Sequence, residues 1–170
     1  MNFKHFIREV PDFPEKGVVF KDITPLLEDP KAFQAAADAL LGFTEGLHID
    51  KVVGIESRGF FYAPLLAYRL GAGFIPARKP GKLPREIRKQ EYDLEYGADA
   101  LELHAESISE GDRVLVHDDV LATGGTARAM CDLIEQLGGE VVQCNFLIEL
   151  GFLKGREKLN GYPLKSLVIY

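Results

Sequence analysis

Residues 114–126, VLVHDDVLATGGT, are the stretch from which the fold can be predicted. A short apolar run typical of a buried strand leads into two adjacent carboxylates, and a Thr-Gly-Gly-Thr turn then precedes a helical pattern. Gly124 and Gly125 would let a phosphate approach backbone N–H groups at the helix N-terminus, where the helix dipole favours an anion. Asp118 and Asp119 are placed to accept hydrogen bonds from sugar hydroxyls. We therefore expect a phosphorylated sugar at this turn.

The alternative interpretation of this segment is an ordinary strand-to-helix turn closed by capping residues. The unbroken order of apolar strand, paired acids and phosphate-sized turn favours the phosphate site over that alternative. The segment is not a Walker loop, because no Gly-Lys-Ser or Gly-Lys-Thr follows it. It also lacks the dinucleotide-binding spacing Gly-x-Gly-x-x-Gly.

Strand and helix patterns alternate along most of the chain. We expect helices at 30–43, 60–70 and 127–137, and strands at 51–55, 72–76, 113–117, 141–150 and 164–169. Asp29 is the expected N-cap of the first helix, with Pro30 as its first residue. The alternation predicts an α/β fold with a mostly parallel central sheet flanked by helices on both faces.

Two stretches interrupt this alternation. The first thirty residues contain five prolines or glycines that leave little room for a long helix, so we expect an irregular extension. Residues 79–93 are polar and cationic, and we expect a mobile loop there, with flanking strands within 94–104.

Charge is unevenly distributed along the chain. The net charge of −6 argues against a nucleic-acid partner, yet residues 78–89 carry six basic residues against one acid. This cluster favours a small, highly charged anion as ligand; charge alone leaves a solvated loop equally open. No stretch approaches the ~20 apolar residues of a membrane span, and the N-terminus lacks the apolar region of a signal peptide. We therefore expect a cytoplasmic protein without a membrane partner.

Histidines and cysteines show no metal-binding pattern. His5, His48 and His104 are scattered, and the spacing of Cys131 and Cys144 matches no common zinc site. We expect no metal site built by the protein alone, and we expect the cysteines to be buried free thiols.

Residues 114–126 resemble the phosphoribosyl pyrophosphate signature of type I phosphoribosyltransferases. Further segments resemble those of adenine phosphoribosyltransferases in the same order: GVVFKDITPLLEDP (17–30), VVGIESRGF (52–60), RKPGKLPRE (78–86), LEYG (94–97) and FLIEL (146–150). Because the resemblance covers nearly the whole chain, the chain is identified as a member of that family. It implies one type I phosphoribosyltransferase domain over 1–170, with a base-binding hood at about 1–30 and a flexible catalytic loop at about 79–96.

The resemblance implies a reaction and its ligands. Adenine and 5-phosphoribosyl 1-pyrophosphate would give AMP and pyrophosphate, with Mg²⁺ bound through the pyrophosphate. Asp118 and Asp119 would hold the ribose hydroxyls. The 5-phosphate would be held by Ala122, Thr123, Gly124, Gly125 and Thr126. The pyrophosphate would be held by Ser57, Arg58, Arg78, Lys79 and Lys82. Because some basic-loop residues come from the neighbouring subunit in this family, a homodimer is expected.

The adenine side rests on the same resemblance. Phe20 and Val120 would pack on opposite faces of the ring, and Val19 and Lys21 would meet its edge through backbone groups. A backbone acceptor separates the 6-amino group of adenine from a 6-oxo group. The alternative for the residues around Phe20 is that they pack in the hydrophobic core and bind no ligand.

Glu95 and Arg58 are the candidate catalytic residues. Glu95, beside Tyr96 in the loop, would manage the proton lost from adenine, while positioning and electrostatics stabilise a cation-like ribose.

Two positions depart from the family pattern. His117 stands where the family usually has an apolar residue, and we expect it to pack at a strand end rather than to act in catalysis. Pro80 replaces a base found in some relatives. Three other functions remain open as alternatives: transfer to xanthine, guanine or hypoxanthine; a phosphoribosyl pyrophosphate-binding transcriptional regulator; and a nucleotide-binding domain without catalysis.

Overall fold

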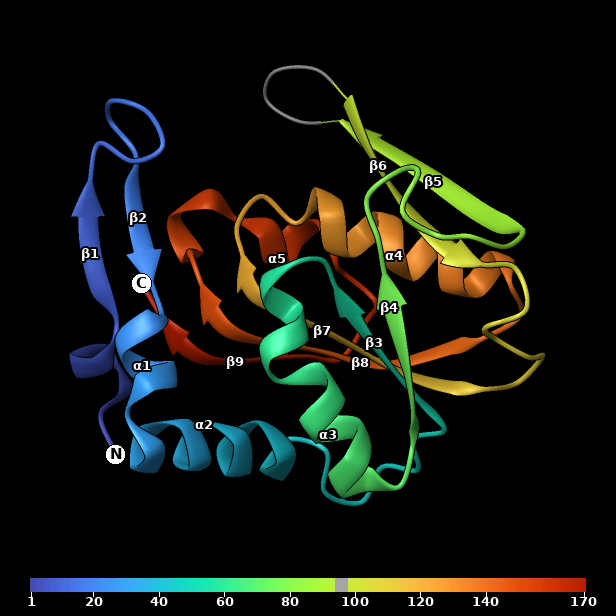
Figure 1. The fold of residues 1–170 in the computed structure, drawn as a ribbon, viewed down its shortest axis with the longest axis horizontal. Coiled ribbons are helices and arrows are strands. Elements are labelled where there is room, and N and C mark those ends of the chain that lie inside the picture. The colour runs from blue at the N-terminus through green and yellow to red at the C-terminus, as the bar shows by residue number, and fades with distance from the viewer. Residues whose placement is uncertain (94–97) are drawn as a thin grey trace. The chain divides into compact units, whose positions relative to one another are not determined.

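The computed structural model describes residues 1–93 and 98–170 (Figure 1). Their contacts divide the chain into two compact units, Met1–Ala39 and Leu40–Tyr170. None of the described helices is both long and apolar enough to cross a membrane.

The N-terminal unit contains more regular structure than the sequence predicts. A 3-10 turn, η1 (Phe3–Phe6), is followed by the antiparallel strands β1 (Arg8–Pro11) and β2 (Val19–Asp22) and by the helix α1 (Thr24–Glu28). The expectation of an irregular extension is wrong because the prolines fall where they are tolerated. Pro11 ends a strand and Pro25 lies in the first turn of α1, where its missing N–H costs no hydrogen bond.

Helix α2 (Pro30–Gly42) begins as predicted. The Asp29 carboxylate accepts hydrogen bonds from the backbone N–H groups of Lys31 and Ala32 at 2.9 and 2.8 Å. These two bonds satisfy donors that have no partner within the helix. The N-cap and the proline at the first helical position are therefore confirmed.

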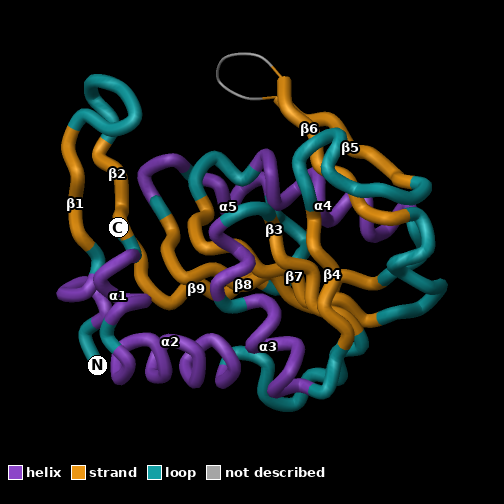
Figure 2. Tube along the Cα trace, viewed as in Figure 1, coloured by secondary structure: helices purple, strands orange, loops and turns teal. Residues whose placement is uncertain are grey.

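The second unit is built on a parallel sheet, as predicted (Figures 1 and 2). Within the described residues it has five strands in the order β4-β3-β7-β8-β9, and every neighbouring pair is parallel. The strands are β3 (Lys51–Ile55), β4 (Gly73–Ala77), β7 (Arg113–Leu121), β8 (Glu140–Glu149) and β9 (Leu164–Ile169).

Helices connect these strands and cover the sheet. The 3-10 turn η2 (Arg58–Phe61) and helix α3 (Ala63–Leu70) lead from β3 to β4, and α4 (Gly125–Gln136) leads from β7 to β8. The first connection leads toward one edge of the sheet, and the second leads toward the opposite edge. Because such crossovers are right-handed, α3 and α4 lie on opposite faces. The 3-10 turn η3 (Gly151–Leu153) and α5 (Gly155–Lys158) precede β9.

The core lies between this sheet and α4. Met130, Leu133 and Ile134 on α4 are buried against β7 and β8. Cys131 and Cys144 are also buried free thiols, with their sulfurs 3.5 Å apart, which confirms that expectation.

The segment expected to be a mobile loop is half strand. Residues 79–86 are irregular, but β5 (Ile87–Asp93) pairs antiparallel with β6 (Ala98–His104). Leu101 and Leu103 of β6 are fully buried, and Tyr92 of β5 packs against the core. The apolar residues of β6 hold the polar β5 in a hairpin, so the loop prediction for 87–93 is wrong. The strand expected within 94–104 is confirmed for 98–104.

The strand order fixes where a ligand can bind. From β3 the chain proceeds to β4 on one side, and from β7 it proceeds to β8 on the other. The carboxyl ends of β3 and β7 therefore lie side by side at a topological switch point. In open α/β sheets this is the place where a crevice for ligands forms.

Candidate active site

A cavity of about 380 Å³ opens at this switch point. It is lined by Glu56, Ser57, Arg58, Lys79, Asp118, Asp119, Val120, Ala122 and Thr126. The first three residues follow β3, and Lys79 follows β4. The others lie near the end of β7 or in the turn and first residues after it. Two other hollows, of about 470 and 540 Å³, lie elsewhere on the same unit. Neither is lined by residues of the glycine turn that precedes α4.

The turn after β7 forms a smaller pocket of about 60 Å³ next to this cavity. Gly124 adopts a left-handed conformation with φ of 81°, and α4 begins at the next residue. A side chain at that φ would be strained, so glycine is required there. The pocket is lined by Asp118, Val120, Leu121, Ala122, Thr123, Gly124, Thr126 and Ala127. Backbone N–H groups at the start of a helix can hold an anion in such a pocket.

Gly155 packs against the backbone of the turn at 122–126. The sequence alone did not identify this role of Gly155. A Cβ atom on Gly155 would lie 2.2 Å from the carbonyl oxygen of Ala122, and one on Gly124 would lie 2.4 Å from that of Gly155. The two backbones are therefore in direct contact. The glycine of Lys-Gly-Arg at 154–156 was the available signal, but a contact between segments thirty residues apart cannot be read from one sequence.

The paired carboxylates lie within β7 rather than after it. The strand continues to Leu121 instead of ending at His117, so both acids lie in its last four residues. Asp118 Oδ1 accepts a hydrogen bond from the N–H of Asp119 at 2.8 Å, and Asp119 Oδ2 lies 2.9 Å from Arg58 Nε. Burial raises the pKa of Asp118 well above its usual value, and the neighbouring Asp119 charge adds to this. Burial also raises the pKa of Asp119, although Arg58 opposes it.

The residues after β3 face these acids. Ser57 and Arg58 line the cavity, and the peptide bond between Glu56 and Ser57 is cis. Gly59 lets the two strand ends approach, because a Cβ there would lie 3.1 Å from Asp118 Oδ1. The structure thus brings together two groups predicted from separate motifs.

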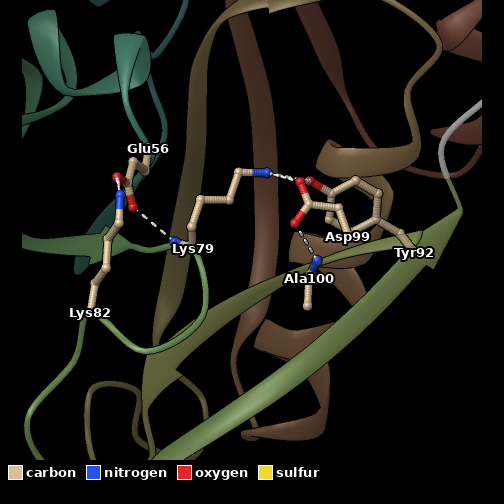
Figure 3. Close-up of polar contacts among 6 residues, drawn as sticks. All are labelled: Glu56, Lys79, Lys82, Tyr92, Asp99 and Ala100. Carbon is tan, nitrogen blue, oxygen red and sulfur yellow. Dashed lines mark hydrogen bonds and ion pairs between the residues drawn. The ribbon is translucent and has the colours of Figure 1, made fainter. Parts of the chain in front are cut away.

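The basic segment after β4 is organised by Glu56 (Figure 3). Its carboxylate accepts from the Lys79 backbone N–H at 2.8 Å and from Arg78 Nε at 3.0 Å, and it pairs with the Lys82 ammonium. Burial alone would raise the pKa of Glu56, but these hydrogen bonds outweigh it and lower the pKa to about 2. Arg78 and Lys82 are therefore held beside the cavity, whereas the Lys79 ammonium points away, toward Tyr92 and Asp99.

The predicted adenine-binding residues fall in two places. Val19, Phe20 and Lys21 form most of β2 in the N-terminal unit. Val19 is exposed, the Phe20 ring makes an edge-to-face contact with Phe13 at 5.1 Å, and the buried Lys21 side chain pairs with Glu9.

The remaining predicted residues divide between the second unit and the segment that is not described. Val120 lines the cavity of the second unit. Glu95 and Tyr96 lie outside the described residues.

His117 is buried at the centre of the sheet. Its Nδ1 lies 2.7 Å from the side-chain oxygen of Asn145 on β8, and the Tyr62 ring packs 6.3 Å away, centroid to centroid. Burial lowers its pKa to about 4, so the ring is neutral and Nδ1 donates. The ring therefore packs in the core, as expected, but it lies within β7 and not at a strand end, because the strand continues to Leu121.

The described residues include no group of three or more His, Cys, Asp or Glu side chains placed to hold a metal ion.

Comparisons with known proteins show the family of this chain. The family model for the phosphoribosyl transferase domain matches residues 23–163. The adenine phosphoribosyltransferase of Christiangramia forsetii is 61% identical over 170 residues, which cover 100% of this chain and 99% of that protein.

Solved structures give the same result. The crystal structure of adenine phosphoribosyltransferase from Thermoanaerobacter pseudethanolicus superposes with a TM-score of 0.97 at 53% identity, covering 99% of this chain and 98% of that one. The enzyme from Saccharomyces cerevisiae, complexed with an imino-altritol bisphosphate and adenine, gives a TM-score of 0.91 at 44% identity, covering 97% and 96%.

Proposed function

This chain belongs to the adenine phosphoribosyltransferase family, and on that premise we propose how its residues divide the reaction between them. The chain transfers the 5-phosphoribosyl group of 5-phospho-α-D-ribose 1-diphosphate to adenine, giving AMP and diphosphate in purine salvage. It is a pentosyltransferase.

One observation carries the assignment of the site. At the switch point, a phosphate-sized pocket at a helix N-terminus adjoins a cavity that is lined by paired carboxylates and an arginine. Phosphoribosyl diphosphate has the matching sequence of groups: a 5-phosphate, ribose hydroxyls and a diphosphate. In this assignment residues 122–126 hold the 5-phosphate, and Asp118 and Asp119 accept hydrogen bonds from the hydroxyls.

Ser57 and Arg58 hold the diphosphate in this proposal, helped by Arg78 and Lys82. Arginine suits a leaving group with several phosphate oxygens because its planar guanidinium donates through two parallel hydrogen bonds. Lys79 lines the same cavity, and in this proposal its backbone, not its ammonium, forms part of the wall. Charge develops on the diphosphate as the C–O bond from the ribose C1 breaks and the C–N bond to adenine forms, and stabilising this charge lowers the barrier.

Mg²⁺ is the proposed cofactor. Phosphate oxygens are the hard ligands that Mg²⁺ prefers, and the carboxylates of Asp118 and Asp119 line the same cavity. When bound, the ion neutralises charge on the diphosphate and makes it a better leaving group. Removal of the metal with EDTA should abolish turnover, and added Mg²⁺ should restore it.

The N-terminal unit supplies the base-binding hood in this proposal. Phe20 is the residue proposed to stack on the adenine ring, and the backbone groups of Val19 and Lys21 are proposed to bond to the ring edge. Val120 is the adenine contact proposed for the second unit. The pairing of the Lys21 side chain with Glu9 supports a backbone role for Lys21, because its ammonium is already engaged.

Glu95 is the proposed general base, acting with Tyr96 in the stretch of sequence between β5 and β6. A carboxylate beside the base nitrogens takes the proton that adenine loses. The variants Glu95→Gln and Glu95→Leu should both reduce kcat strongly. Near-normal turnover in both variants would remove Glu95 from the mechanism.

A homodimer is the proposed assembly. Phe61, Tyr68 and Phe74 are exposed aromatics on η2, α3 and the edge strand β4. Burial of such side chains commonly drives association between copies. Sedimentation should give twice the chain mass.

Sharing of the basic loop between subunits can be tested separately. Mixing an Arg78→Ala chain with an excess of an Asp118→Asn chain should return the KM for phosphoribosyl diphosphate to the wild-type value if Arg78 serves the neighbouring site. If each site uses its own Arg78, the mixture should keep the raised KM of Arg78→Ala.

A purine panel tests the proposed function. Purified protein, Mg²⁺ and phosphoribosyl diphosphate should release diphosphate with adenine and far more slowly with hypoxanthine, guanine or xanthine. A preference for any oxo-purine would overturn the base assignment. The cytoplasmic location stays a prediction.

A further inference from the structure

Lys79 connects two parts of the second unit that are far apart in the sequence (Figure 3). Its backbone N–H donates to Glu56 at the end of β3, and the residue lines the cavity. Its side chain extends the other way, to the β5–β6 hairpin. There the ammonium donates to the Tyr92 hydroxyl at 2.8 Å and forms an ion pair with Asp99.

Tyr92 and Asp99 form a matched acceptor for this ammonium. They are cross-strand partners in the β5–β6 register, and the Tyr92 hydroxyl donates to Asp99 Oδ2 at 3.2 Å. The other oxygen of Asp99 accepts from the Ala100 N–H at 2.8 Å, which fixes the carboxylate plane. Both side chains in the ion pair are about two-thirds shielded from solvent, at 34% exposed for Lys79 and 27% for Asp99.

The charged state of this contact is stable around neutral pH. Burial pushes the pKa of Asp99 upward, but hydrogen bonds from Lys79 and the Ala100 N–H outweigh it and the pKa is lowered. Burial pushes the pKa of Lys79 downward, and the bonds to Asp99 and Tyr92 reverse that as well. Charge-assisted hydrogen bonds of this kind are about twice as strong as neutral ones.

The position of the contact along the hairpin gives it a consequence for the reaction. Tyr92 and Asp99 flank residues 93–98 in the sequence, the segment that contains Glu95. The contact with Lys79 therefore fixes the positions of the two residues that flank that segment, one on each side. It does so from Lys79, a residue whose backbone is fixed at the cavity wall.

We propose that Asp99 and Tyr92 are positioning residues, which act through the Lys79 ammonium to hold the end of the β5–β6 hairpin in place relative to the diphosphate side of the cavity. This inference rests on the proposed function in one respect, the role of Glu95 in proton transfer. The contact itself is independent of that role.

A competing role for Lys79 predicts the opposite effect. If the Lys79 ammonium were needed on the diphosphate, Asp99 would withhold it, and removal of the Asp99 charge would strengthen substrate binding. The two roles can be separated by the sign of the change.

Asp99→Asn is the main test variant, because it keeps the shape and the Oδ1 acceptor for Ala100 but removes the charge. Tyr92→Phe keeps the ring that packs on the core and removes only the hydroxyl. Glu91→Gln is the matched control, since it breaks an exposed ion pair with Lys89 on the same hairpin.

We expect Asp99→Asn to lower kcat roughly tenfold and Tyr92→Phe to lower it less, with the KM for phosphoribosyl diphosphate within about twofold of wild type. Amide hydrogen exchange in peptides from 87–104 should become roughly tenfold faster in Asp99→Asn, while peptides from β7 and β8 stay protected. Glu91→Gln should change neither measurement. An increased kcat, or a KM lowered severalfold, in Asp99→Asn would overturn the proposal, as would unchanged exchange.

The Glu95 variants separate this inference from the proposed function. If Glu95→Gln is slow but Asp99→Asn is not, the positioning role is wrong and the catalytic role stands. If hydrogen exchange responds to Asp99→Asn but Glu95→Gln turns over normally, the hairpin is positioned as proposed and the catalytic role of Glu95 is wrong.

Discussion

Replacing Gly155 by alanine would push a methyl group into the backbone of the phosphate turn. An ideal Cβ at this position lies 2.2 Å from the Ala122 carbonyl oxygen and 2.9 Å from the Gly124 nitrogen. Real Cβ atoms essentially never come within 3.0 Å of such a neighbour, so the turn or the start of α5 has to move by at least 0.8 Å. The φ of Gly155 is not in the left-handed region, so the penalty is steric and not conformational.

The expected loss follows from the size of this displacement. Misplacing a binding group by about 1 Å can cost up to ~100-fold in rate, and overpacking costs about 1–3 kcal/mol in stability. We expect Gly155→Ala to lower kcat/KM for phosphoribosyl diphosphate by roughly 10- to 100-fold. The Kd for ribose 5-phosphate, measured by titration calorimetry, should rise in proportion, while the KM for adenine changes little.

Gly42→Ala provides the control, since a Cβ at Gly42 meets nothing within 4 Å. Its kinetics and ribose 5-phosphate affinity should match wild type. If Gly155→Ala folds and binds ribose 5-phosphate with unchanged Kd, then residues 122–126 do not hold the 5-phosphate through their backbone, and the reasoning is refuted.

Three further predictions concern charged or titratable groups. Arg78→Ala should raise the KM for phosphoribosyl diphosphate severalfold in steady-state kinetics without changing that for adenine; an unchanged value counts against the diphosphate assignment. Because the folded pKa of Glu56 is depressed from 4.5 to about 2, its pairs with Arg78 and Lys82 stabilise the fold fully above pH 4.5 and lose that contribution as the pH falls toward 2. The difference in unfolding free energy between wild type and Glu56→Gln should therefore shrink over this range, and a difference that grows would contradict the ion pairs. The His117 ring should titrate by NMR near pH 4 in the folded protein, so its stability contribution is lost as pH falls from 6.5 toward 4; a midpoint above 6 would place it in solvent.

Local sequence patterns predicted several helix ends and strands of the structure well, because these features depend on residues that are neighbours in the sequence. Asp29 and Pro30 marked the start of α2, and Gly71 ends α3 in a left-handed conformation with φ of 66°. The strand at 164–169 has the predicted bounds. In each case one capping residue or one apolar run settles the structure.

Errors arose where long-range contacts decide. Nothing in residues 87–93 alone marks a strand, since β5 forms by pairing with β6, whose Leu101 and Leu103 are buried. The same holds for β1 and β2, which stabilise one another across the turn 12–18. A polar strand with a partner elsewhere in the chain has the same composition as a loop.

The candidate site followed a similar division. The turn at 122–126 and the acids before it were predictable because one continuous segment carries them. Their juxtaposition with Arg58 depends on the strand order, and the contacts of Gly155 and Asp99 depend on the tertiary fold. Motif resemblance named Lys79 as a diphosphate ligand, whereas its ammonium is engaged by the hairpin in this structure.

A crystal structure of the chain with Mg²⁺ and phosphoribosyl diphosphate tests the division of labour within the site most directly. We expect the 5-phosphate against the backbone N–H groups of 123–126, the ribose hydroxyls on Asp118 and Asp119, and the diphosphate beside Ser57 and Arg58. A 5-phosphate bound anywhere else, or a diphosphate at the glycine turn, would contradict it.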